Sequence, residues 1–297
     1  MANLKKIGFI GTGVMGSGII KNMLKAGYAV TVFNRTKAHA DPVVKAGATW
    51  VQSPKKVAQD SEIVFTMVGF PQDVEEVYFG DNGIFAGTTA GQTVVDMTTS
   101  TPTLAKKIGA YGKEHQIQVL DAPVSGGDIG AQKGTLTIMV GGDKSAYEGL
   151  QPIFKAIGQQ VNYFGLAGSG QHAKMANQIM IAGTMTGMSE MLVYAQAAGL
   201  DLPKVLQTLE SGGADNWSME NYAPRILKDD YTPGFFAKHF LKDLRIALNE
   251  ADKMHLNLPA TDAARNLYAR LVDEKGLGNN GTQALVKLWW KDGKLPS

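Results

Sequence analysis

A polar row opens the long apolar stretch that follows the loop GSGQHAKMANQ. Gln171, Lys174 and Asn177 are spaced three residues apart, and residues with that spacing share one face of a helix. We therefore expect the row to face a cleft. A lysine in a cleft can exchange a proton with a substrate oxygen, and a nearby amide can orient the lysine or the substrate. Because most lysines in the first turns of a helix are solvated charges, this chemistry needs support from elsewhere in the chain.

A possible anion site follows the apolar run IQVLDAPV. Ser125 supplies a hydroxyl, and Gly126 and Gly127 supply amides without side chains. Successive backbone N–H groups in such a turn form a concavity that suits a carboxylate. Ligands of doubly wound sheets bind beyond the carboxyl ends of the strands, which is where a strand ending at Val124 would place this turn. Taken alone, an ordinary Gly-Gly loop fits these residues equally well.

A nucleotide-binding pattern lies near the N-terminus. The run KKIGFIG leads into a G-x-G-x-x-G turn and then into the helical pattern SGIIKNMLKAG, with a second strand-like run, YAVTVFN, after it. This is the context in which the motif binds a dinucleotide, because the glycines allow a tight turn, close approach of a pyrophosphate and close helix packing. The helix start also offers unpaired N–H groups to phosphates. The predicted cofactor contacts in this turn are Gly11, Thr12, Gly13, Val14, Met15 and Gly16.

The residues after the second predicted strand indicate which nicotinamide cofactor is bound. NAD-binding proteins usually place an acid there to bind the ribose 2′-hydroxyl, whereas this chain has Asn34, Arg35 and Thr36. A carboxylate would repel a 2′-phosphate, but a guanidinium and a hydroxyl can bind it. We therefore predict that NADP is preferred and that NAD remains possible.

These residues need a scaffold, and the sequence predicts one in two parts. The first half alternates strand and helix patterns, which indicates βαβ units on a parallel sheet. After Gly165 only helical patterns remain, the first of them running from Gln171 to Leu200. We expect an α/β N-terminal domain over 1–165 that binds NADP and an all-α C-terminal domain over 166–297. The predicted strands are 5–11, 28–34, 62–68, 92–97, 117–124, 135–142 and 159–165, and the later helices are 171–200, 202–213, 240–255, 259–276 and 282–293.

Composition excludes several classes of function. The 297 residues carry a net charge of only +2 and no cysteine, so we expect no nucleic-acid partner, no disulfide and no thiol catalysis. The histidines show no metal-ligand spacing, and no metal is predicted. The two most apolar stretches are interrupted by glycines near the N-terminus and by Glu190 farther along, which argues against a membrane span. We predict a cytoplasmic protein, because a cysteine-free chain suits a reducing compartment.

Five segments in this order resemble the β-hydroxyacid dehydrogenase family: GFIGTGVMG, FNRT, DAPVSGGDIGAQKG, GSGQHAKMANQ and FLKDLRIALNEA. That family includes 3-hydroxyisobutyrate dehydrogenase, tartronate semialdehyde reductase and glyoxylate/succinic semialdehyde reductase. The resemblance covers nearly the whole chain. It implies a Rossmann domain joined by a long interdomain helix to an all-α domain. It also implies an NAD(P)-dependent oxidoreductase that interconverts a small β-hydroxy acid and its aldehyde or semialdehyde, with hydride transfer at nicotinamide C4.

The resemblance implies roles for individual residues. Lys174 matches the family's general acid/base. Two departures concern the substrate rather than the type of reaction: Gln178 stands where many members have a second asparagine, and TMVGFP differs from the common M-L-P pattern. The implied substrate contacts are Ser125, Gly126, Gly127, Asn177, Phe235 and Asp243, and the implied further cofactor contacts are Met67, Val68, Thr99 and Lys242.

Three alternatives stay open at this point. Oxidation of 3-hydroxyisobutyrate with NAD is disfavoured by Arg35 and by the absence of an acid beside it. An imine reductase on the same fold is disfavoured by Lys174, because those enzymes commonly replace the lysine. A catalytically silent NADP-binding protein is disfavoured because Lys174, Asn177 and Ser125 are all present. The apolar interdomain helix predicts a homo-oligomer, a dimer or a tetramer, since such a surface needs covering.

Overall fold

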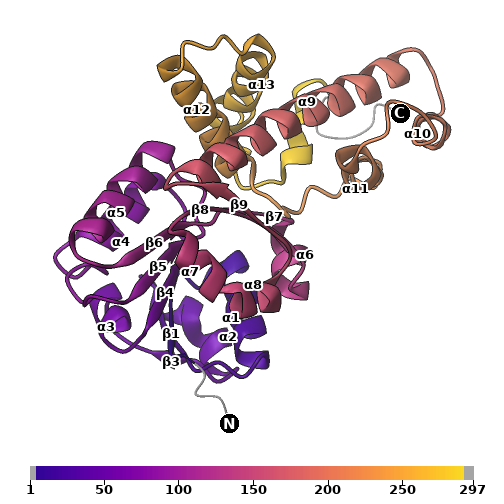
Figure 1. Ribbon diagram of the computed structural model, residues 1–297. Coiled ribbons are helices and arrows are strands. Elements are labelled where there is room, and N and C mark those ends of the chain that lie inside the picture. Colours follow the sequence, from indigo (N-terminus) through magenta and orange to yellow (C-terminus); the bar gives the residue numbers. More distant parts are fainter. Residues whose placement is uncertain (1–4, 291–297) are drawn as a thin grey trace. The chain divides into compact units, whose positions relative to one another are not determined.

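The N-terminal half of the chain folds around one nine-stranded sheet with the order β3-β2-β1-β4-β5-β6-β8-β7, in which β9 also pairs with β8 (Figure 1). The computed structural model describes residues 5–290. Its contacts divide the chain into two compact units, Met1–Lys174 and Met175–Ser297, and the sheet belongs to the first. The strands are β1 Ile7–Ile10, β2 Val30–Phe33, β3 Thr49–Trp50, β4 Ile63–Thr66, β5 Thr93–Asp96, β6 Gln118–Asp121, β7 Val124–Ser125, β8 Leu136–Gly142 and β9 Gly158–Gly165.

The strands β1 to β6 are parallel, so their carboxyl ends meet at one edge of the sheet. Thr66 at the end of β4 pairs with Asp96 at the end of β5, and Asp96 pairs with Asp121 at the end of β6. This edge is where the ligand-binding turns of a doubly wound sheet lie.

The predicted parallel sheet is confirmed through β6, and beyond it β8 runs antiparallel to both β6 and β7. Only the short helix α6 (Gly127–Lys133) separates β7 from β8, and a parallel connection needs a dozen or more residues. The predicted strand 117–124 is divided into β6 and β7 by Ala122 and Pro123, and proline cannot donate to a ladder.

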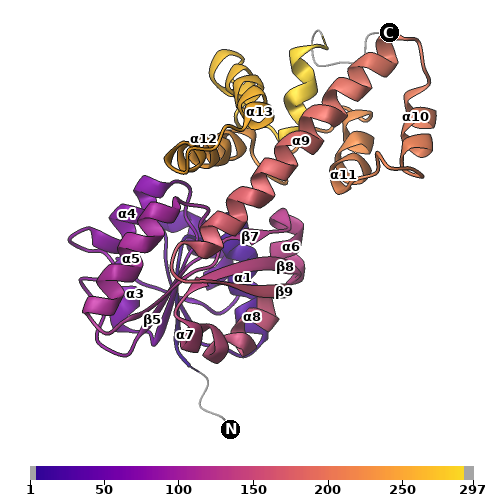
Figure 2. The same ribbon diagram turned by 45° about the horizontal axis from the view of Figure 1, so that its top comes forward.

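Helices cover both faces of the sheet (Figures 1 and 2). Pro54, Pro71 and Pro102 each occupy the first position of a helix, where the missing N–H costs nothing. Ser53 and Thr101 cap two of these helices by accepting from the backbone N–H three residues on, which fixes where each loop ends. The helical elements are α1 Val14–Lys25, η1 Lys37–Ala40, α2 Asp41–Val44, α3 Pro54–Gln59, α4 Pro71–Phe79, α5 Pro102–Glu114, α7 Lys144–Gly149 and α8 Gln151–Ile157.

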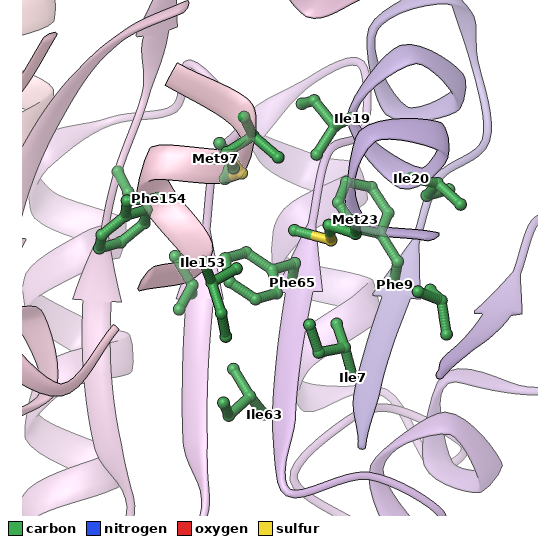
Figure 3. Close-up of a cluster of buried hydrophobic side chains, with 14 of the residues drawn as sticks. Ile7, Phe9, Ile19, Ile20, Met23, Ile63, Phe65, Met97, Ile153 and Phe154 are labelled. Atoms are coloured by element: carbon green, nitrogen blue, oxygen red, sulfur yellow. The ribbon is translucent and has the colours of Figure 1, made fainter. Parts of the chain in front are cut away.

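Alternating strand residues build a hydrophobic core on each face. On one face, Phe9 and Phe65 stack with ring centroids 6.2 Å apart, beside Met23 of α1 and Phe154 of α8 (Figure 3). On the other face, residues of the same strands pack against α3, α4 and α5. Burial on both faces explains why these strands read as continuous apolar runs in the sequence.

The second unit is helical. The helix α9 (Ser169–Ala197) begins in the first unit and continues into the second. Within residues 175–290, strand pairing is limited to one isolated bridge between Phe236 and Gly281. The remaining elements are α10 Leu202–Leu209, α11 Trp217–Ile226, α12 Ala237–Lys253, α13 Pro259–Ala269, a π-helical turn Arg270–Glu274 and a 3₁₀ segment Thr282–Leu288.

One predicted helix differs from the observed structure, and one observed helix was not predicted. The helix expected over 282–293 is a 3₁₀ segment over its first seven residues, and its end, from residue 291 on, lies outside the described residues. The helix α11 was not predicted, because Pro224 interrupts its pattern; it is capped by Asn216, whose side chain accepts from Met219 N.

One stripe of α9 is exposed in the described chain. Met180 and Tyr194 are 67% and 76% exposed, and Gly183 and Gly187 lie between them on this stripe. A Cβ atom at either glycine would meet nothing within 4 Å. None of the helices within residues 5–290, α9 included, combines the length and the apolarity needed to cross a membrane.

Candidate active site

The glycine turn joins β1 to α1 at the carboxyl edge of the sheet. A Cβ at Gly11 would lie 2.0 Å from the carbonyl oxygen of Met67, and one at Gly16 would lie 1.9 Å from the carbonyl oxygen of Gly11. The fold itself therefore requires these two glycines. A Cβ at Gly13, the N-cap of α1, would meet nothing within 4 Å. The open space at a helix N-terminus fits the phosphates of a dinucleotide.

The side chain of Asn34 holds the glycine turn against the end of β2. Its Oδ1 accepts from Thr12 N at 2.9 Å, and its Nδ2 donates to the Thr36 carbonyl at 2.9 Å. The side chain of Arg35 is 89% exposed and lies 3.4 Å from Asp73 Oδ1. An exposed ion pair of this kind contributes little to stability, so the guanidinium can change partners at small cost.

At the same edge, the loop after β4 contacts the glycine turn, and the loop after β5 contacts the loop after β4. Met67 N donates to the Ile10 carbonyl at 2.9 Å. Val68 N donates to Thr98 Oγ1 at 3.0 Å, and Thr98 N donates to Asp96 Oδ1 at 3.0 Å. The structure thus brings together the cofactor contacts predicted at Gly11 and Met67.

The turn at Ser125 has the backbone conformation that its two glycines allow. Gly126 and Gly127 have φ angles of 121° and 62°, a region that other residues rarely adopt. Ser125 pairs with Thr137 in the β7–β8 ladder and is half-buried. The turn leads directly into α6, so its amides belong to a helix start at the sheet edge.

Asp121 binds the start of α9, a role that was not predicted from the sequence. Its two carboxylate oxygens accept from Gly168 N and Gln171 N, both at 2.8 Å. Asp121 is 2% exposed, and this burial raises the pKa of its carboxyl to about 6, although the backbone N–H groups oppose the rise. Its place as the one charged residue inside the predicted apolar strand 117–124 was the available signal.

The side chain of Gln171 does not face a cleft, and that part of the prediction is wrong. It is fully buried, and its amide donates to the Thr98 carbonyl at 2.7 Å and accepts from Ser100 N at 3.0 Å. Lys174 lies one turn farther along α9 and is 6% exposed. Its side chain is therefore buried and is not an ordinary solvated charge.

In the second unit, a polar chain joins α9 to α12. Asn177 Nδ2 donates to Gln178 Oε1 at 2.7 Å, and Gln178 Nε2 donates to Asp243 Oδ2 at 2.7 Å. Lys242 Nζ lies 2.9 Å from Asp243 Oδ1. Gln178 and Asp243 are almost completely buried, so this unit holds Asn177, Lys242 and Asp243 in one network. No site role was predicted for Gln178, although its departure from the double-asparagine pattern was a signal.

Two predicted contacts remain, Phe235 and Thr99. Phe235 is half-buried and packs edge to face on Phe240, with ring centroids 5.8 Å apart. Thr99 lies in the loop that follows β5, between Thr98 and Ser100, the two residues that Gln171 binds. Within residues 5–290, no cluster of three or more His, Asp or Glu side chains is arranged to hold a metal ion.

Comparisons with known proteins agree with this architecture. The family model described as the NAD binding domain of 6-phosphogluconate dehydrogenase matches residues 6–165. The model described as NAD-binding of NADP-dependent 3-hydroxyisobutyrate dehydrogenase matches residues 168–289.

Whole-chain relatives are also found. An uncharacterized oxidoreductase of Bacillus subtilis (strain 168) is 50% identical over 287 residues, which are 97% of this chain and 99% of the relative. The 2-hydroxy-3-oxopropionate reductase of Escherichia coli (strain K12) is 39% identical over 263 residues, covering 89% of this chain and 90% of the relative. A solved structure of Mycobacterium tuberculosis 3-hydroxyisobutyrate dehydrogenase with L-serine has a TM-score of 0.87 at 25% identity, covering 96% of this chain and 99% of that chain.

A doubly wound sheet with a glycine turn at its carboxyl edge, followed by a helical unit, is the architecture of a nicotinamide-dependent oxidoreductase. Both family models and the whole-chain relatives narrow this class to one family of such oxidoreductases. The chain belongs to the β-hydroxyacid dehydrogenase family.

Proposed function

We propose that this enzyme interconverts a small β-hydroxy acid and its aldehyde or semialdehyde, prefers NADP, and uses Lys174 as its general acid/base. The observation that carries the proposal is the burial of Lys174, which is only 6% exposed, one turn after a helix start that is bonded to the carboxyl edge of the sheet. Lysines are mostly solvent-exposed, so this burial distinguishes Lys174 from an ordinary surface charge. The family match supports the same assignment.

The residues of this chain would divide the work as follows. The nicotinamide, when bound, supplies or accepts the hydride. Lys174 gives a proton to the substrate oxygen during reduction and removes it during oxidation. The amides of Gly126 and Gly127, with the Ser125 hydroxyl, hold the substrate carboxylate. Asn177 orients the lysine or the substrate oxygen, and its own amide is held by Gln178.

The Lys174→Ala variant tests the assignment of the general acid/base. We expect kcat to fall by about 100-fold or more, because general acid–base catalysis contributes at least that factor. NADPH binding, followed by fluorescence, should change little. Lys155→Ala is the matched control, because Lys155 is an exposed lysine on α8. A Lys174→Ala enzyme that binds NADPH and keeps its kcat would refute the proposal.

One turnover assay can measure both the substrate preference and the cofactor preference. The Ser125 turn supports a small acid that carries an aldehyde, and the exposed guanidinium of Arg35 supports the 2′-phosphate of NADP. A panel of small aldehyde acids, with uncharged aldehydes as controls, should show that turnover requires the carboxylate and is faster with NADPH than with NADH. A strong preference for NADH would contradict the cofactor assignment.

The setting of the enzyme is part of the proposal. We infer a cytoplasmic enzyme, because the chain has no cysteine and such a chain suits a reducing compartment. We also infer a dimer or tetramer of identical chains. The exposed side chains of Met180 and Tyr194 on α9 support this assembly, because exposed apolar side chains on one face of a helix favour a partner.

A further inference from the structure

Gln171 binds the loop after β5 through both ends of its side-chain amide. Its Nε2 donates to the Thr98 carbonyl at 2.7 Å, and its Oε1 accepts from Ser100 N at 3.0 Å. These two backbone groups flank Thr99. The glutamine thus pairs with this short segment much as a neighbouring strand would, and it holds both ends of the loop at once.

The helix that carries Gln171 has little freedom at its own start. Asp121 accepts from the backbone N–H groups of Gly168 and Gln171. A Cβ at Gly170 would lie 2.4 Å from the Met139 carbonyl oxygen and 2.5 Å from that of Asp121, so the first turn of α9 packs directly on the backbone of the sheet edge. The position of the Gln171 side chain therefore follows from the position of the sheet.

Gln171 also lies on the same helical face as Lys174, three residues earlier. Both side chains are buried, at 0% and 6% exposure. The loop that Gln171 binds is itself hydrogen-bonded to the segment after β4, because Thr98 Oγ1 accepts from Val68 N. One amide thus connects the predicted cofactor loops to the helical turn that carries the lysine.

We propose that Gln171 is a positioning residue, whose amide fixes the Thr98–Ser100 loop in register with the first turns of α9 and so sets Lys174 relative to the cofactor contacts at Val68 and Thr99. This role rests on the proposed function, because it assigns the proton transfer to Lys174. Proton and hydride transfer need their groups placed accurately, and a misplacement of about 1 Å can cost about 100-fold in rate.

The first test is Gln171→Met, which keeps the length of the side chain and removes its donor and acceptor. The matched control is Gln92→Met. Gln92 also brackets backbone groups, donating to the carbonyls of Ala58 and Ser61, but it precedes β5 at the opposite end of the sheet. Both variants should unfold at a lower temperature than the wild type. Only Gln171→Met should lower kcat, by about 100-fold, with a nearly unchanged KM for the substrate.

The second test asks whether Gln171 acts through Lys174. Comparing Gln171→Met in the wild-type and Lys174→Ala backgrounds gives a double-mutant cycle, and residues that act as a unit are strongly non-additive. We expect the loss of kcat from Gln171→Met to disappear when Lys174 is already absent. An equal loss in both backgrounds would overturn the inference.

The third test is Gln171→Glu, which also serves if the methionine variant folds poorly. An ionised carboxylate still accepts from Ser100 N but repels the Thr98 carbonyl. A protonated carboxyl can donate to that carbonyl and restores the hydrogen bonds of the glutamine. The kcat of this variant relative to wild type should therefore be low at high pH and recover as the pH falls. A ratio that stays constant with pH would count against the role.

The outcomes separate the two proposals. If Lys174→Ala abolishes turnover while Gln171→Met and Gln171→Glu lower only the unfolding temperature, Gln171 is a structural residue and the proposed function stands. If Lys174→Ala keeps its kcat, the proposed acid/base and the positioning role that depends on it both fail.

Discussion

The three glycines of the G-x-G-x-x-G turn are glycine for different physical reasons. Gly11 and Gly16 have backbone atoms where their Cβ would stand, whereas Gly13 has open space there. The fold therefore explains the first two and does not explain the third. Close approach of a bound pyrophosphate to the backbone would explain it.

This difference predicts the effect of alanine at Gly13. Gly13→Ala should fold with an unfolding temperature close to that of the wild type and raise the KM for NADPH by about tenfold or more, since each tenfold corresponds to only about 1.4 kcal/mol of lost binding. Gly16→Ala should instead lower the unfolding temperature, because its methyl group collides with the Gly11 carbonyl. Steady-state kinetics and thermal unfolding measure the two effects. Unchanged affinity for NADPH in Gly13→Ala would show that the phosphates do not approach this residue.

At the scale of secondary structure, a buried acid at the end of β6 forms hydrogen bonds to the start of α9. Asp121 accepts from two backbone N–H groups at the helix start. Burial disfavours the carboxylate and raises its pKa from 3.8 to about 6. The ionised form is thus present near neutral pH at a cost in stability, which the hydrogen bonds only partly offset.

The raised pKa predicts how stability changes with pH. Between pH 3.8 and about 6 the folded protein holds a proton on Asp121 that the unfolded chain releases. The contribution of this group is therefore fully present below the unfolded pKa and is lost as the pH rises through about 6. Relative to Asp121→Asn, which cannot titrate, the wild type should lose up to about 3 kcal/mol of unfolding free energy over this range. Urea unfolding of both proteins across the range measures it, and a constant difference would contradict the raised pKa.

Elements defined by local pattern could be predicted, whereas long-range pairing could not. The spacing of glycines after KKIGFIG predicts the turn from β1 to α1, because the conformation of this turn depends on a few neighbouring residues. The antiparallel direction of β8 depends on a connection through α6 and on partners distant in sequence.

The same contrast holds for the candidate site. Helical spacing placed Gln171 and Lys174 on one face, but it could not show that backbone groups of Thr98 and Ser100 cover the glutamine. Gln178 was interpreted only as a departure that concerns the substrate, because the sequence does not show that its amide donates to Asp243 on a distant helix. The type of a residue predicts which interactions its side chain can form, whereas the fold determines which partners lie within reach.

At the scale of the whole molecule, α9 has a surface that predicts assembly. Met180 and Tyr194 on its exposed stripe are each more than two-thirds exposed. We expect size-exclusion chromatography with light scattering to give two or four times the chain mass of 31.8 kDa. Met180→Glu should shift the equilibrium toward the single chain, because a charge in a covered apolar surface is costly. A wild-type mass of one chain at micromolar concentration would contradict the assembly.

The glycines on that stripe carry a consequence for thermostability. In a helix surrounded by water, alanine is about 1 kcal/mol more favourable than glycine, and Gly183 and Gly187 have room for the added methyl group. Replacing them should therefore strengthen the longest helix of an isolated chain. If a second chain packs closely on the stripe, the same methyl groups would intrude and the melting temperature would fall. The sign of the change in melting temperature therefore shows whether a second chain packs closely on this stripe.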